Sequence, residues 1–100
     1  MTQIIIVGAG GHSKVVADSA VRAGFSIRGF VDDRANSAPL PDYQLIGTIA
    51  DLTSMHLMHG STKIVIAIGD NPTRMKVAKR LALPPERYAT VIDPSAVVSQ

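Results

Sequence analysis

Short apolar runs alternate with longer amphipathic stretches along the chain, which is the pattern of an α/β protein. Apolar runs rich in β-branched residues are expected to form strands at 4–7, 25–31, 62–68 and 88–92. Apolar residues at helical spacing predict helices over 11–23, about 50–59 and 71–83. Residues 45–49 add a short extended piece, and the turn formers gathered in 34–44 indicate a surface loop.

The predicted helices have recognisable ends and apolar faces. Gly24 is placed to end the first helix and Pro84 to end the third. Asn71 and Pro72 fit the N-cap and the first position of the third helix. The predicted apolar positions are Val15, Val16, Ala17, Ala20, Val21 and Ala23 in the first helix, and Met75, Val77, Ala78, Leu81 and Ala82 in the third.

The order βαβαβαβ calls for a parallel sheet with right-handed crossovers. We therefore predict a Rossmann-like, three-layer α/β domain with strand order 2-1-3-4. Strands 4–7 and 62–68 are neighbours in that order, and each is followed by a glycine turn. Because carboxyl ends of parallel strands meet at one edge, we expect a single ligand-binding crevice above Gly8–His12 and Gly69–Asn71.

The first glycine turn has the chemistry of a phosphate site. Gly8, Gly10 and Gly11 allow a sharp turn and let an anion approach the amides without meeting a Cβ. The following helix directs its unpaired N–H groups and positive dipole end at the same point. His12 can donate to an anion, and Lys14 adds a cation, although helix capping and a solvated lysine are the alternatives for these two residues.

A dinucleotide fingerprint is only partly present at this turn. Gly8 and Gly10 match its first two glycines, but Ser13 occupies the third position. Asp32 or Asp33 stands at a suitable distance for a ribose hydroxyl. The pattern predicts a nucleotide and does not separate NAD from other nucleotides.

A second group of candidate residues follows strand 62–68. Gly69 begins the turn, where Asn71 is explained by helix capping and Asp70 by a turn. Arg74 lies in the first turn of a helix, where the dipole repels a cation. An anion held between the two helix starts would explain Arg74, and a solvated surface arginine is the alternative.

Composition narrows the possible functions. One hundred residues, 46% of them hydrophobic and 18% charged, suit one folded domain. A net charge of +2 and few aromatic residues argue against nucleic-acid binding. The absence of cysteine excludes disulfides and thiolate metal sites, and His56 and His59 lack a carboxylate at metal-ligand spacing. No apolar run is long enough to span a membrane, so a cytoplasmic protein without a metal is the default expectation.

Four segments together resemble one family over essentially the whole chain. They are residues 6–16, 29–33, 68–74 and 89–96. The family is that of the bacterial sugar acetyltransferases, which includes sialic acid O-acetyltransferases and nucleotide-linked amino-sugar N-acetyltransferases.

The resemblance implies that residues 1–92 form the nucleotide-sugar-binding domain of a transferase in bacterial surface glycan synthesis, with a UDP-sugar as the expected ligand. It also implies contacts to each part of that ligand. These are Gly10, Gly11, His12 and Lys14 around the diphosphate, Asp32 and Asp33 near the nucleoside, and Asn71 and Arg74 on the phosphate or sugar side.

The same resemblance assigns the acyl-transfer chemistry to residues outside this chain. Residues 93–100 are expected to begin a left-handed β-helix of hexapeptide repeats, with Asp93 where the family usually has histidine. The family's β-helix binds acetyl-CoA, carries the catalytic histidine and forms homotrimers. This chain is therefore expected to contain no catalytic residue and no cofactor, and to bind its ligand without turnover.

Two other functions remain open. An NAD-binding or redox-sensing Rossmann module is favoured by Gly8, Gly10 and Asp32, and opposed by Ser13 and by the lack of a second mononucleotide half. A docking domain that has kept the fold and lost its ligand is the third hypothesis.

Overall fold

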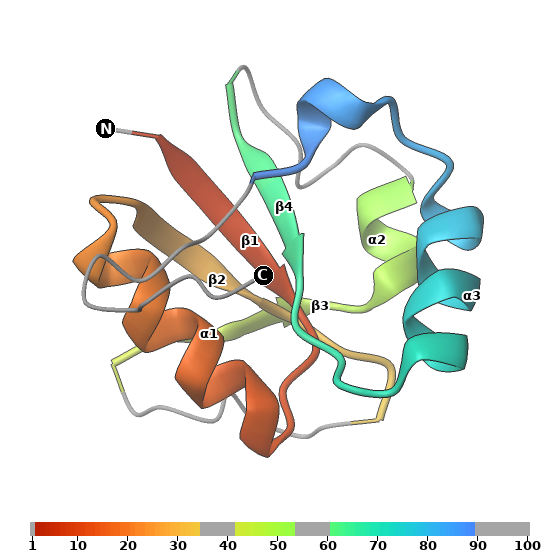
Figure 1. The fold of residues 1–100 in the computed structure, drawn as a ribbon, viewed down its shortest axis with the longest axis horizontal. Coiled ribbons are helices and arrows are strands. Elements are labelled where there is room, and N and C mark those ends of the chain that lie inside the picture. The colour runs from red at the N-terminus through yellow and green to blue at the C-terminus, as the bar shows by residue number, and fades with distance from the viewer. Residues whose placement is uncertain (1, 35–41, 54–60, 90–100) are drawn as a thin grey trace, which may run out of the picture.

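The computed structural model describes residues 2–34, 42–53 and 61–89. A parallel sheet with the order β3-β2-β1-β4 forms its centre, and helices cover both faces (Figure 1). The elements are β1 (Gln3–Val7), α1 (Gly11–Arg22), β2 (Ser26–Val31), β3 (Leu45–Gly47), α2 (Ile49–Thr53), β4 (Lys63–Ile66), α3 (Asn71–Leu81) and the 3-10 turn η1 (Pro85–Arg87).

β1 lies in the middle of the sheet, and its apolar residues are buried on both faces of it. Its residues Ile4, Ile5, Ile6 and Val7 are all 0% exposed. Successive side chains of a strand point to opposite faces. Ile4 and Ile6 accordingly belong to the core on the α1 side, and Ile5 and Val7 to the core shared with α2 and α3. This is the predicted three-layer α/β domain.

The predicted strand order is confirmed around β1. β1 pairs with β2 on one side and with β4 on the other, and both pairs are parallel. The predicted last strand is represented among the described residues by a parallel bridge between Ile64 and Tyr88. The short piece expected at 45–49 is a true edge strand, β3, beside β2.

The buried face of α1 agrees with the prediction only in part. Ala17 and Ala20 face the sheet as predicted, together with Ser13, whereas the predicted Val15 and Val21 are 63% and 50% exposed. Small side chains on the buried face let a helix lie close to a sheet, because no large side chain has to be accommodated between the two backbones. The larger Val15 and Val21 are therefore left toward solvent, while Val16 packs partly buried against the core.

α3 buries Val77 and Leu81, as expected, but Met75 is 62% exposed. The helix ends at Leu81 and does not reach the predicted Leu83. Ala82 adopts the left-handed conformation, with φ of 49°, and its amide donates to the Ala78 carbonyl. Leu83 precedes a proline, which disfavours helical backbone at that position.

Several predictions concern residues outside the described ranges. They are the second half of the 50–59 helix with His56 and His59, most of the loop 34–44, and the strand and hexapeptide coil expected beyond residue 89. Within the described ranges, no helix combines the length and apolarity needed to cross a membrane.

Candidate phosphate site

The turn after β1 depends on Gly8. This residue has a φ of +113°, and a Cβ added to it would lie 2.9 Å from the Ala67 carbonyl oxygen at the end of β4. The Gly8 amide donates to the Val31 carbonyl over 2.8 Å, and the Ala67 amide donates to the Val7 carbonyl over 2.8 Å. The glycine turn is therefore fixed between the ends of β2 and β4.

The start of α1 is open. Gly10 is the N-cap, has no side chain with which to cap the helix, and no acidic residue lies in the first turn. By helix geometry the first amides, including those of Gly11 and His12, have no acceptor within the helix. Among the described residues, no atom lies within 4 Å of a Cβ placed on Gly10 or Gly11, so packing against this part of the chain does not require either glycine.

Ser13 shows how the chain departs from the dinucleotide fingerprint. It occupies the third glycine position, is 0% exposed, and its hydroxyl donates to the Gly10 carbonyl. Its amide donates to the same carbonyl over 3.1 Å. The small serine therefore fits between helix and sheet and keeps its own polar group satisfied.

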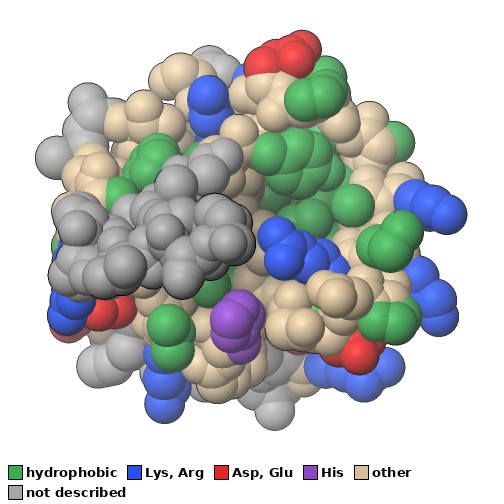
Figure 2. All heavy atoms as spheres, viewed as in Figure 1, with side chains coloured by type: hydrophobic (Ala, Val, Ile, Leu, Met, Phe, Trp, Pro, Cys, Tyr) green, Lys and Arg blue, Asp and Glu red, His purple; other side chains and the backbone are tan. Residues whose placement is uncertain are grey.

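The two glycine turns lie side by side, as predicted. A Cβ on Gly69 would come 3.9 Å from Cγ of His12. His12 of α1 and Asn71 and Arg74 of α3 line one cavity of about 770 Å³. In the space-filling view, histidine and basic side chains lie near a hollow with a hydrophobic floor (Figure 2). Residues from the starts of both helices can therefore meet one ligand.

The start of α3 differs from that of α1 and corrects the predicted cap. Asp70, and not Asn71, is the N-cap: its Oδ2 accepts from the Thr73 amide over 3.0 Å and from the Thr73 hydroxyl over 2.6 Å. These two hydrogen bonds hold the pKa of Asp70 below its ordinary value, and the bond from the Thr73 hydroxyl has the larger effect. Pro72 has no N–H to offer. The start of α3 therefore offers an anion fewer free amides than the start of α1, and its Asn71 and Arg74 side chains line the cavity.

The corrected cap changes the interpretation of two candidate residues. Because Asn71 is not the N-cap, capping does not explain why this residue lines the cavity. Arg74 is exposed and lies one turn after the ionised Asp70, which offsets part of its repulsion by the helix dipole. The ion pairs Arg22–Asp18 and Arg80–Asp33 do not use Arg74.

Asp32 and Lys14 lie outside this cavity. The Asp32 carboxylate accepts from the amides of Ala9, over 2.9 Å, and Arg34, over 2.7 Å. Lys14 lines a separate cavity of about 260 Å³ together with Asp18 and Tyr43. Contact of Asp32 or Lys14 with a nucleotide stays a prediction.

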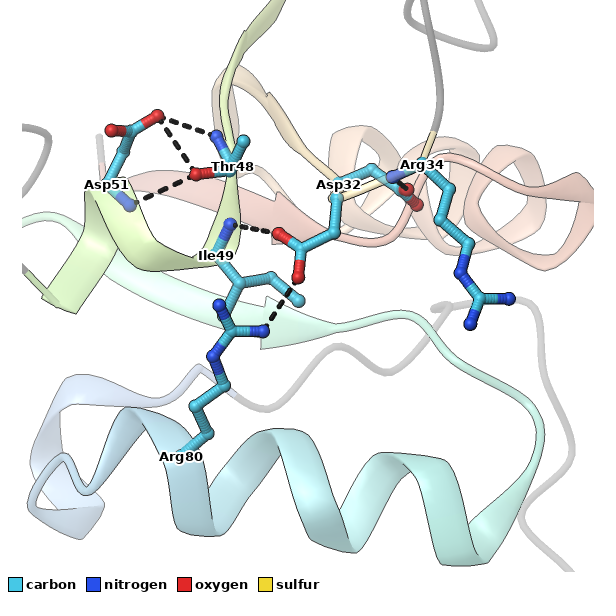
Figure 3. A network of polar contacts seen from close by, with 7 residues as sticks. Asp32, Arg34, Thr48, Ile49, Asp51 and Arg80 are labelled. Carbon is cyan, nitrogen blue, oxygen red and sulfur yellow. Dashed lines mark hydrogen bonds and ion pairs between the residues drawn. The ribbon is translucent and has the colours of Figure 1, made fainter.

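Asp33 is held by α2 and α3. Its carboxylate accepts from the Ile49 amide over 3.0 Å and pairs with Arg80 over 2.7 Å. Figure 3 shows Ile49 and Arg80 with the dashed lines of these two contacts. Two hydrogen bonds keep the pKa of Asp33 below its ordinary value. The one from Arg80 has the larger effect, and the one from the Ile49 amide has the smaller effect. Its contact with a nucleoside likewise stays a prediction.

Four residues have roles that the sequence did not predict. Asp70 carries a signal that was available, because an acidic residue three positions before Thr73 is a typical N-cap. Arg80 carried none, since its partner is 47 positions away. Val15 and Met75 were predicted to be core and instead line the cavity as exposed apolar side chains.

Known proteins resemble this chain in both sequence and structure. It is 30% identical to the UDP-N-acetylbacillosamine N-acetyltransferase of Bacillus subtilis over 101 residues, which cover 100% of this chain and 47% of that protein. The acetyltransferase domain of PglB from Neisseria gonorrhoeae, in complex with acetyl coenzyme A, has a TM-score of 0.66 and 34% identity, covering 80% of this chain and 38% of that one. A variant of perosamine N-acetyltransferase from Caulobacter crescentus, in complex with CoA and GDP-perosamine, has a TM-score of 0.73 and 30% identity, covering 99% and 46%.

The chain spans less than half the length of each of these three relatives. Their names bear out the resemblance to bacterial sugar acetyltransferases that the four sequence segments indicated. A family model described as the PglD N-terminal domain matches residues 3–81, a range that includes both glycine turns and all three helices. On this ground the chain belongs to the PglD N-terminal domain family.

Proposed function

We propose that this chain binds the diphosphate of a nucleotide-linked sugar at the start of α1, beside His12, Asn71 and Arg74. One observation carries the proposal. His12, which lies in the uncapped first turn of α1, borders the same cavity as Asn71 and Arg74, although α1 and α3 pack on opposite faces of the sheet. A diphosphate suits such a place because the helix amides and the side-chain donors are arranged around one point.

Electrostatics favours α1 over α3 as the phosphate-binding helix. The ionised Asp70 carboxylate at the start of α3 repels an anion, whereas no acidic residue lies in the first turn of α1. Arg74 is placed to approach the ligand from the α3 side and offset that repulsion. We infer that the amides of Gly11 and His12 meet the phosphate oxygens, and that Asn71 and Arg74 meet the outer phosphate or the sugar.

Within a full-length protein, this binding would serve acetyl transfer. The amine or hydroxyl of the sugar would attack the carbonyl of acetyl-CoA, form the amide or ester, lose its proton to a base, and release CoA as the thiol. We propose that acetyl-CoA and the base belong to the part of the protein beyond this chain, in a homotrimeric β-helix. The present chain would hold the acceptor in place.

The nucleotide is proposed to be UDP. The curated relative that aligns with the whole chain carries a UDP-sugar in its name, whereas the perosamine enzyme was crystallised with GDP-perosamine. Titration calorimetry of the chain with UDP, GDP, NAD and CoA separates these alternatives. Binding of UDP, with no binding of NAD or CoA, is the expected result. Binding of NAD alone would support the redox module instead, and no binding at all would support a docking domain.

The site itself is tested by His12→Ala and Arg74→Ala. Loss of a charge-assisted donor should weaken UDP binding by about 1–3 kcal/mol in each variant. Lys79→Ala is the matched control for Arg74, because Lys79 is an exposed cation on the same helix outside the cavity. Lys14→Ala tests the predicted diphosphate contact of Lys14. Unchanged affinity in both His12→Ala and Arg74→Ala would reject this site.

A further inference from the structure

Asp32 reaches back from the end of β2 to the turn that follows β1. Its Oδ2 accepts from the Ala9 amide over 2.9 Å, across 23 positions of sequence, and its Oδ1 accepts from the Arg34 amide over 2.7 Å. Its backbone is fixed as well, since its own amide donates to the Gly47 carbonyl of β3 over 3.2 Å. Both oxygens of this carboxylate therefore have N–H donors from the protein.

This arrangement determines which amides of the turn remain for a ligand. The Gly8 amide is bound to Val31 and the Ala9 amide to Asp32. Beyond the N-cap Gly10, the amides of Gly11 and His12 have no intrahelical acceptor. The Ala9–Asp32 hydrogen bond thus fixes the backbone immediately before the amides that would meet a phosphate.

In a dinucleotide site, the acidic residue at this place binds the ribose hydroxyls. Here the same residue is turned to the backbone of the glycine turn. We propose that Asp32 is a positioning residue of the phosphate site, which acts through the Ala9 amide, and that it does not bind the ribose of the ligand. The inference rests on the proposed function and specifies how that site is built.

The positioning role of Asp32 and a general effect of its charge predict opposite changes in anion affinity. A carboxylate near a bound diphosphate repels it, so removing the charge by Asp32→Asn would by itself strengthen anion binding. The asparagine keeps the shape of the side chain but offers one acceptor oxygen in place of two. A loss of phosphate affinity in this variant would therefore arise from the released turn.

The test is calorimetry on the chain with UDP, its 2′-deoxy and 3′-deoxy analogues, and inorganic pyrophosphate. Asp32→Asn is expected to weaken binding of all four ligands by a common factor of about ten. Asp18→Asn is the control, because it removes the same charge from an exposed ion pair of α1, and it should change affinity less than about threefold.

The alternatives give different patterns. If Asp32 binds ribose, Asp32→Asn weakens UDP binding, leaves pyrophosphate binding unchanged, and has no effect on one of the deoxy analogues. That pattern, or tighter binding of pyrophosphate, would overturn the inference. If the unmodified chain binds neither nucleotides nor pyrophosphate, the proposed function itself fails.

A second measurement requires no variant. In the unmodified chain, the NMR chemical shift of the Ala9 amide should follow the titration of the Asp32 carboxyl group, and the Ala9 amide should exchange slowly with solvent. An Ala9 amide that is insensitive to this titration and exchanges freely would overturn the positioning role, whether or not Asp32→Asn folds.

Discussion

Gly8 and Gly10 lie two positions apart in the same turn, yet replacing each by alanine should have opposite effects. Alanine at position 8 would have to adopt a φ of +113° and place its Cβ 2.9 Å from a backbone oxygen, that of Ala67. Such a backbone conformation costs about 1–3 kcal/mol, and forcing an extra carbon into a packed site costs a further 1–3 kcal/mol or so. The free energy of unfolding should therefore fall by about 2–6 kcal/mol.

Gly10 supplies the matched control. Its φ is −84°, which alanine adopts readily, and an added Cβ meets no atom of the described residues within 4 Å. Gly10→Ala should change the free energy of unfolding by less than about 1 kcal/mol. The added methyl group would, however, project into the open space in front of the helix amides, so UDP affinity should fall.

Urea unfolding followed by circular dichroism measures the stability difference, and calorimetry of the folded variants measures binding. For a domain of this size each kcal/mol corresponds to a change of about 4–8 °C in Tm, so the two variants should be readily distinguished. Equal stability of Gly8→Ala and Gly10→Ala would refute the strain argument. Unchanged UDP affinity in a stable Gly10→Ala variant would refute the assignment of the open glycine to the ligand.

Three further predictions concern the fold around the site. Arg80 and the Ile49 amide lower the pKa of Asp33 from 3.8, so its contribution to stability is complete above that value and is lost as the pH falls through the lowered pKa. Because the pair is partly exposed, Asp33→Asn should cost under about 1 kcal/mol at pH 7 and less at pH 2, as measured by urea unfolding at both pH values. Asp70→Ala should lower the Tm at neutral pH by removing the cap of α3, and this effect should vanish in acid. Asp42→Ala is the control, because it removes an exposed acid that caps none of the described helices, and it should not lower the Tm. Leu81→Ala should cost about 2–5 kcal/mol of unfolding free energy, whereas Met75→Ala should cost under about 1 kcal/mol, and similar costs would contradict the orientation of α3.

The sequence predicted the sheet well because its signals are local. The run at 4–7 is apolar at every position, and only a strand covered on both faces requires that pattern. Gly8 and Gly24, both placed at expected turns, have positive φ values in the structure. Element order then limited the possible topologies, so the neighbours of β1 could be predicted without any knowledge of long-range contacts.

The buried faces of the helices were harder to predict, because how deeply a side chain is buried depends on contacts with distant parts of the chain. Helical spacing alone placed the valines and the alanines of α1 together on one apolar face. The structure buries Ser13, Ala17 and Ala20, a choice that depends on the distance between helix and sheet. Arg80 could not be paired with Asp33 for the same reason, since 47 residues separate the partners and only packing brings them together.

The acidic residues after β2 show why a motif needs its three-dimensional context. A fingerprint states that an acid stands about twenty positions after the glycines, and it says nothing about which group that acid meets. Asp32 meets the amide of Ala9, and Asp33 meets Ile49 and Arg80. Consecutive residues thus connect β2 to the turn before α1 and to α3, the two elements that carry His12, Asn71 and Arg74. If the proposed function is right, a change at either acid should affect phosphate binding through geometry, and the affinity for pyrophosphate, which has no ribose, is the quantity that reveals it.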